Sequence, residues 1–223
     1  RSTSACGPLT TLGVMMSRAA AVLLVIAFAA SASGCGSEDA TTVKLAAALA
    51  SVRDGGIPAP MPRTAAVDAS DGNPYPGQKL AVTPASCLGV VPGTLAGMVG
   101  EAEPLAGVQL NGTTLVAGRP ASTAEASAGL QRLRAAADAC RVLMLTPASG
   151  GPAPATFALS DAAPDGVLVT ITTQAPGGQQ TMRLAEGVIG RAVVVVSSTS
   201  ADDAAMRRLW AETAKAVTDV QIA

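Results

Sequence analysis

The 223-residue chain contains no histidine, and its other candidate catalytic groups are few. Without histidine, neither a Ser-His-Asp nor a Cys-His arrangement can form, and a zinc site with histidine ligands is excluded. The lysines, which are Lys44, Lys79 and Lys215, lie outside any Ser-x-x-Lys sequence, so a Ser-Lys nucleophile is unsupported. Walker-type and G-x-G-x-x-G phosphate-binding motifs are also missing. We therefore expect a protein that is not an enzyme and that holds no metal or cofactor.

Aromatic residues make up 2% of the chain, and its 15 basic residues nearly balance its 16 acidic residues. Stacking platforms for bases need aromatic faces, and a nucleic-acid interface needs a basic patch. The sequence shows neither pattern, because its basic residues are scattered. Nucleic acid is therefore not an expected partner, and the core must be built from Val, Leu, Ile and Ala.

What the sequence does have near its start is a short export signal. Met15–Arg18 supplies an initiator and a positive charge, and the apolar run 19–30 follows. A bilayer-spanning helix needs about 20 apolar residues, whereas a signal-peptide core has about 7–15. The next residues, Ala32-Ser33-Gly34-Cys35, resemble the lipobox of bacterial lipoproteins, although Ala32 stands where leucine is usual. In that motif the cysteine is diacylated and becomes the new N-terminus.

The pattern predicts a protein lipid-anchored through Cys35, on the extracytoplasmic face of the cell membrane. The alternative is an ordinary secretory signal cut near Ala32, which would leave Cys35 as a free thiol; both alternatives export the protein. The expected organisation is an upstream segment over 1–14, a signal peptide over 15–34, a tether over 35–40 and a single α+β domain over 41–223.

Two cysteines remain for the folded domain once Cys35 carries lipid and Cys6 is set aside with the upstream segment. An exported protein with two remaining cysteines is expected to join them, here as a Cys87–Cys140 disulfide. A metal-binding or redox pair is the alternative, but the wide spacing and the absence of histidine argue against it.

Periodicity and turn residues predict an α+β fold, in which a largely antiparallel sheet is packed with helices. Helices are expected over 41–53, 122–139 and 201–220, with a short helix near 87–91. Strands are expected over 79–83, 107–110, 113–117, 141–146, 155–160, 167–174, 179–185 and 188–198, with a further short strand near 64–69.

Local signals support several of these elements. Asn111-Gly112 predicts a type I′ hairpin, because both residues tolerate positive φ. Ser122 and Glu125 form a capping box at a helix start. Val193–Val196 is apolar on both faces and predicts a central strand. Further turns are expected at Asp165-Gly166, at 176–178 and at Glu186-Gly187.

Trp210 is the one weak candidate for ligand binding. It lies on the apolar stripe of the expected C-terminal helix, together with Met206, Leu209 and Val217. A lone tryptophan on such a stripe is more often part of the core than of a pocket, although pockets are lined by the same kind of apolar group.

Three segments, Thr83–Cys87, Ala136–Cys140 and Gly190–Val195, are similar to a known family. They resemble the extracellular sensor domain of a mycobacterial Ser/Thr receptor kinase and the related actinobacterial lipoproteins. The resemblance implies an antiparallel sheet with helices, a disulfide from the early cysteine to the helix-end cysteine, and a central cleft that binds an unidentified small ligand. This chain lacks the second disulfide of the sensor domain, and Ala137 stands where the family favours tryptophan.

Export, the missing catalytic groups and the resemblance together predict a non-catalytic, membrane-anchored lipoprotein. Its expected partners are the membrane, through the lipid, and an unknown small molecule or envelope protein. A carrier of lipid or another apolar molecule is the alternative, and it would need a cavity of several hundred Å³ lined by Val, Leu and Met. A shallow polar cleft would instead favour sensing.

Overall fold

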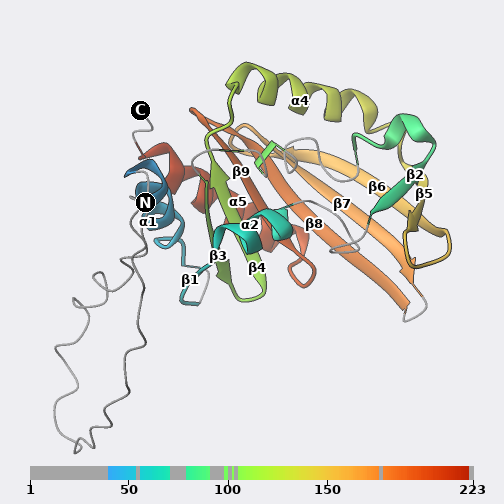
Figure 1. Ribbon diagram of the computed structural model, residues 1–223, viewed down its shortest axis with the longest axis horizontal. Coiled ribbons are helices and arrows are strands. Elements are labelled where there is room, and N and C mark those ends of the chain that lie inside the picture. The colour runs from blue at the N-terminus through green and yellow to red at the C-terminus, as the bar shows by residue number, and fades with distance from the viewer. Residues whose placement is uncertain are drawn as a thin grey trace, which may run out of the picture. The chain divides into compact units, whose positions relative to one another are not determined.

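The computed structural model describes residues 40–53, 56–70, 79–90, 98–99, 102, 105–175 and 178–220. The predicted signal peptide and Cys35 therefore lie outside the described residues. The described residues belong to one unit, built around a nine-stranded sheet (Figure 1). None of the helices in this part of the chain has the length and hydrophobicity needed to span a membrane.

All neighbouring strands in the sheet pair antiparallel, in the order β1-β3-β4-β9-β8-β7-β6-β5-β2. The fold is therefore α+β with an antiparallel sheet, and the predicted class is confirmed. The strands are β1 Ala59–Pro60, β2 Leu80–Thr83, β3 Leu105–Leu110, β4 Thr113–Gly118, β5 Val142–Pro147, β6 Ala153–Ala162, β7 Gly166–Ala175, β8 Gly178–Ile189 and β9 Ala192–Ser198.

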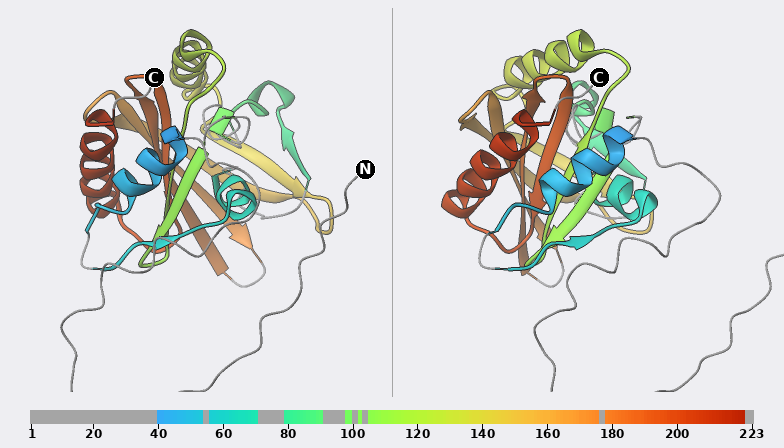
Figure 2. Two further views of the ribbon diagram at one scale, coloured as in Figure 1. Left: turned by 60° about the vertical axis from the view of Figure 1, so that its left-hand side comes forward. Right: turned by 90° about the vertical axis from the view of Figure 1, so that its left-hand side faces the viewer.

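Helices cover both faces of the sheet (Figure 2). On one face lie α1 Ala40–Leu49 and α5 Asp203–Thr218, which contact each other and the strands β3, β4, β8 and β9. On the other face lie α2 Arg63–Ser70, α4 Thr123–Ala136 and the short 3₁₀ helix η1 Ala85–Cys87. The sheet is thus the middle layer of three.

The central strand β9 shows how the sequence supports this arrangement. Val193 and Val195 belong to the core cluster under α2 and α4, whereas Val194 and Val196 belong to the cluster under α1 and α5. All four are 0% exposed. Successive side chains in a strand point to opposite faces, so a strand covered on both sides must be apolar at every position. The predicted central strand is confirmed.

The β3–β4 hairpin turns at the predicted dipeptide. Asn111 has φ 49° and Gly112 has φ 76°, so both residues occupy the left-handed region. A type I′ turn requires this conformation at both central positions, and asparagine followed by glycine adopts it at low cost.

The two longest helices begin at side-chain caps. Ser122 Oγ accepts a hydrogen bond from the Glu125 amide at 3.1 Å. Asp202 Oδ1 accepts one from the Ala205 amide at 2.7 Å. Such an oxygen satisfies an amide that has no partner within the helix. Ser122 is the predicted cap of the first helix, and α5 begins within the expected helical range 201–220.

The short strand expected near 64–69 is wrong, because this segment is the helix α2. The Ala66 amide donates to the Pro62 carbonyl at 3.0 Å, so Pro62 opens the helix, where its fixed φ and missing N–H cost little. The helix packs closely on β3 at Gly107. A Cβ at Gly107 would come within 2.6 Å of the Ala66 Cβ, so this approach requires glycine.

The turn expected at Glu186-Gly187 is also wrong. β8 continues through both residues to Ile189, and the chain reverses at Gly190, which has φ 60°. The strand predicted over 188–198 is therefore split between β8 and β9. Gly187 is not a turn glycine; it lies directly opposite Gly166 of β7 in the sheet register.

The pair Gly166 and Gly187 makes room for Trp210. A Cβ at Gly166 would lie 2.5 Å from Trp210 Cζ2, and one at Gly187 would lie 2.9 Å from Trp210 Cη2. The indole is 0% exposed, and its N–H donates to the Pro164 carbonyl at 2.9 Å. Trp210 is therefore a central core residue of the α1 and α5 face.

Within the described residues, one disulfide bond closes the opposite face. Cys87 in η1 and Cys140 just after α4 are joined, with an S–S distance of 2.10 Å and a Cα–Cα distance of 5.7 Å. Both cysteines are buried in the core cluster under α4. The predicted pairing is confirmed.

Candidate functional site

The site residues predicted from the sequence do not converge on one place. Cys35 lies outside the described residues. Cys87 and Cys140 are bonded to each other within one core cluster, whereas Trp210 belongs to the cluster on the other face. Trp210 is fully buried, which supports its assignment to the core, so it is not part of the candidate site.

The most distinctive cavity among the described residues is a basic pocket of about 310 Å³. It is formed where β4 ends, where α4 begins, and where β8 turns into β9. We call it the basic pocket; its lining residues are Arg119, Pro120, Ala121, Thr123 and Arg191.

Sheet topology explains why these residues meet. Gly118, the last residue of β4, pairs with Val193, near the start of β9. Because the two strands are antiparallel, the end of one lies beside the beginning of the other. Arg119 follows Gly118, and Arg191 stands just before β9 in the turn after Gly190. Two guanidinium groups that are far apart in the sequence are thereby brought to one pocket.

Arg191 differs from the ion-paired arginines of the domain. It is exposed, and within the described ranges it has no ion-pair partner. Three other arginines form ion pairs: Arg134 with Asp161 at 3.3 Å, Arg141 with Asp138 at 2.6 Å, and Arg183 with Asp203 at 2.6 Å. Arg191 thus retains its capacity to bind an anion.

The pocket suits a small anionic group. Guanidinium groups present several N–H donors in a planar fork that matches carboxylate and phosphate oxygens. No acidic side chain lines the pocket, and the Thr123 hydroxyl adds a further polar group. Its volume is at the lower end of the range for small-molecule sites. A positively charged lining is unsuited to a metal cation, and no cluster of three potential metal ligands occurs in the described part of the chain.

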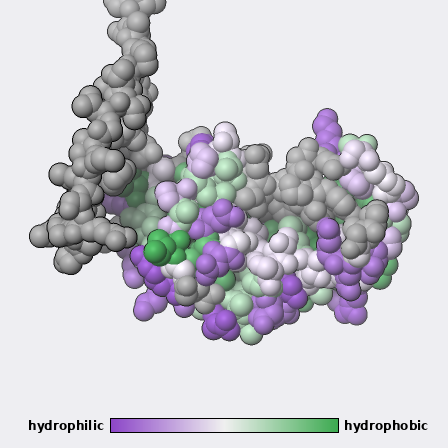
Figure 3. Space-filling view, turned by 90° about the horizontal axis from the view of Figure 1, so that it is seen from below, coloured by the Kyte–Doolittle hydropathy of each residue, from purple (hydrophilic) through white to green (hydrophobic). Residues whose placement is uncertain are grey.

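Two further cavities are less suited to a small ligand. A pocket of about 250 Å³ beside Phe157 and Leu159 contains Asp138 and Arg141, whose charges already pair with each other. A wider and more open groove of about 520 Å³ lies between α1 and α5, and its lining combines three alanines and Val220 with Lys44, Ser51 and Asp219. The surface seen from below in Figure 3 is mostly hydrophilic around a small hydrophobic group, which is ordinary for a folded domain.

Sequence reasoning did not identify Arg119 or Arg191 as site residues. Arg191 entered the prediction only as part of the Gly190–Val195 segment, and nothing local distinguishes Arg119 from other basic residues. The burial of Glu186, which lies outside the basic pocket, was also not predicted, because this residue was expected in a turn. It is 0% exposed on β8, where its sheet neighbours Val167 and Val195 belong to the cluster under α4.

No family model and no curated protein matches the chain. Among solved structures, the chain is similar to the extracellular domain of PknH from Mycobacterium tuberculosis, with 15% sequence identity and a TM-score of 0.43. That similarity covers 63% of this chain and 76% of the PknH domain. Membership of the sensor-domain family stays a prediction from the sequence.

Proposed function

We propose that this chain is an extracytoplasmic lipoprotein, anchored to the cell membrane through Cys35, whose domain binds a small anionic ligand without transforming it. The basic pocket is the observation that carries the binding half of the proposal. Its two arginines, Arg119 and Arg191, fit phosphate or carboxylate groups, and the ligand is expected to be of metabolite size.

The Cys87–Cys140 disulfide supports export. Structural disulfides form and persist in oxidising compartments outside the cytoplasm, and this one is buried in the core. The apolar run 19–30 followed by the lipobox-like Ala32–Cys35 provides the route and the attachment point.

A binding role is favoured over catalysis by the composition of the pocket. A positioned general base or nucleophile needs a side chain such as His, Glu, Cys or Lys, and the residues that line the basic pocket are Arg, Pro, Ala and Thr. Arginine remains charged at physiological pH, so it holds an anion but does not exchange a proton with it.

The carrier alternative finds no support in the three cavities described above. None of these three is lined mainly by Val, Leu and Met side chains. The large apolar side chains instead fill the two core clusters on either side of the sheet.

Calorimetric titration of the oxidised lipoprotein in detergent tests the binding half, with inorganic pyrophosphate and citrate as phosphate and carboxylate probes. Arg191→Gln and Arg119→Gln should each weaken binding of the preferred probe about tenfold or more, because a hydrogen bond to a charged group contributes about 1.5–3 kcal/mol. Arg208→Gln is the matched control, since Arg208 is an exposed arginine of α5 outside the pocket.

Equal affinities of all three variants and the parent protein would contradict the pocket assignment. Phosphorus NMR of the pyrophosphate mixture reports on catalysis, and the proposal expects the probe to remain intact. The anchor is tested separately by intact-mass measurement of the membrane-extracted protein, in which Cys35→Ser should remove the acyl mass and release the chain from the membrane fraction.

A further inference from the structure

The attachment point and the folded domain are separated by a very short stretch of chain. Five residue steps lead from Cys35 to Ala40, the first residue of α1. A fully extended chain advances at most about 3.6 Å per residue, so Ala40 lies within about 18 Å of Cys35. By comparison, the 12 residues of β8 extend over about 40 Å. A tether shorter than the domain restricts which end of the domain can approach the membrane.

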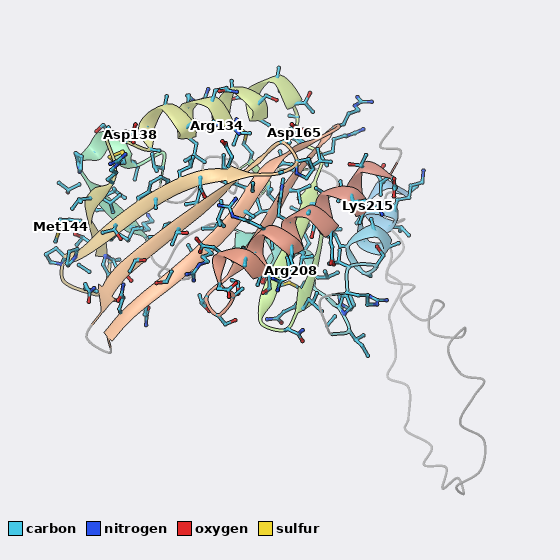
Figure 4. All side chains as sticks on the ribbon, turned by 180° about the vertical axis from the view of Figure 1, so that it is seen from behind. Arg134, Asp138, Met144, Asp165, Arg208 and Lys215 are labelled. Atoms are coloured by element: carbon cyan, nitrogen blue, oxygen red, sulfur yellow. A yellow bond between two sulfur atoms is a disulfide. The ribbon has the colours of Figure 1, made fainter. Side chains whose placement is uncertain are left out.

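The end that carries α1 also carries the C-terminal half of α5. The two helices contact each other, and the groove between them joins Lys44, Ala47 and Ala48 of α1 to Ala216 of α5. Figure 4 shows Lys215 on the part of α5 beside α1, whereas Met144 of β5 lies at the opposite end of the domain. The short tether therefore keeps this helical end closer to the bilayer than the β5 end.

The surface at this end combines exposed apolar groups with lysine. We call it the α1–α5 surface and define it by the residues Val43, Lys44, Ala47, Lys215, Ala216, Asp219 and Val220. Val43 is 50% exposed, although it is a large hydrophobic residue. Lys44 is the one charged residue of α1, and Lys215 follows on α5. Asp219 also lines the groove and partly offsets these two positive charges.

We propose that the α1–α5 surface rests on the same membrane that holds the lipid anchor, with the bilayer surface as its occupant. This inference rests on the anchoring at Cys35 proposed above and is independent of the basic pocket. Apolar side chains enter the headgroup region, and lysines are attracted to anionic lipids. Weak contacts suffice, because the tether converts docking into an intramolecular event at high effective concentration.

Docking of the α1–α5 surface on the membrane would also determine which edge of the sheet faces away from it. The edge of the sheet formed by β5 and β2 is directed away from the membrane, since it lies at the end opposite α1. A soluble partner would therefore reach that edge more readily than the α1–α5 surface.

The test uses the full lipoprotein, expressed with its own leader and reconstituted into vesicles of phosphatidylethanolamine and phosphatidylglycerol. A fluorophore is attached to Val43→Cys or, as the matched control, to Thr156→Cys, which is an exposed position on β6. Nitroxide-labelled lipid should quench the Val43 label several-fold more strongly than the Thr156 label. Equal quenching, or stronger quenching at Thr156, would overturn the proposal.

A second pair of variants tests the charge. Lys44→Gln should lower the docking equilibrium about fivefold on vesicles that contain phosphatidylglycerol, as expected for one lysine near an anionic surface. Lys79→Gln is the control, because Lys79 is exposed and lies next to β2, at the other edge of the sheet. Equal effects of the two substitutions would count against the α1–α5 surface.

Failure of the anchor and failure of the docking surface are distinguishable. Intact mass shows whether Cys35 carries acyl chains. If it does not, the exported protein is coupled through the Cys35 thiol to a maleimide lipid in the same vesicles. The quenching comparison is then made with the fluorophore introduced at the two positions as an unnatural amino acid. Preferential quenching at Val43 would support the surface even though the acylation proposal had failed.

Discussion

On the face of the sheet under α1 and α5, the Trp210 indole fills the space above Gly166 and Gly187, whereas on the face under α2 and α4 a disulfide ties η1 to the end of α4. The Trp210 indole stabilises its face by packing, that is, by contacts made in the folded state. The disulfide is covalent, and in the chain-entropy model it stabilises the fold mainly by restricting the unfolded chain.

The covering elements explain why the two faces differ. α5 has 16 residues and buries the large side chains of Met206, Leu209 and Trp210. α4 has 14 residues, and alanine and glycine make up half of its buried positions. Beside it, η1 has three residues. The α1 and α5 face is thus held by bulky buried side chains, whereas the α4 face combines smaller helical contacts with a crosslink.

Truncating the indole should produce the largest loss of stability. Trp210→Ala removes a fully buried tryptophan and leaves a cavity, so the free energy of unfolding should fall by about 3–5 kcal/mol. Denaturant unfolding of the oxidised protein measures this loss, and Glu212→Ala, an exposed position on the same helix, is the control. Equal costs for the two substitutions would refute the view that packing closes this face.

Breaking the disulfide should cost nearly as much on the opposite face. Cys87 and Cys140 are separated by 53 residues, and closing a loop of that length stabilises the fold by about 4 kcal/mol in the chain-entropy model. The Cys87→Ser, Cys140→Ser double variant should show this loss, and adding reductant to the parent protein should reproduce it. A stability unaffected by reductant would contradict the assignment.

The glycine pair offers a sharper test of the packed face. Gly166→Ala places a methyl group 2.5 Å from the indole, and overpacking of this kind typically costs about 1–3 kcal/mol. The three nearest atoms at that position all belong to Trp210, so the cost should largely vanish in a Trp210→Ala background. A double-mutant cycle measures this coupling. Additive losses would mean that the glycine is required for another reason.

Removing a helix cap should have the smallest effect, and it should be alike on both faces. Ser122→Ala at α4 and Asp202→Ala at α5 each lose one hydrogen bond to a backbone amide, which costs about 1 kcal/mol. Thermal unfolding of the two variants measures the losses. A much larger loss for one of them would show that its cap also supports tertiary packing, which would change the comparison of the faces.

Local chemistry made several parts of the fold predictable from the sequence. Asn111-Gly112 specifies its own turn, Ser122 specifies a helix start, and Val193–Val196 is apolar on both sides of its strand. The Cys87–Cys140 pairing followed from the count of cysteines in a chain that its sequence predicts to be exported. In each case the information lies within a few adjacent residues or in a residue count.

Tertiary structure alone decided the features that depend on distant neighbours. Gly187 lies within β8, paired with Gly166 and close to the Trp210 indole, and residues 64–69 form a helix that approaches β3 at Gly107. Arg119 and Arg191 meet because antiparallel pairing places the end of β4 beside the start of β9. Sequence patterns indicate the local structure of a few neighbouring residues. A pocket depends instead on strand register, which is set by packing across the whole sheet.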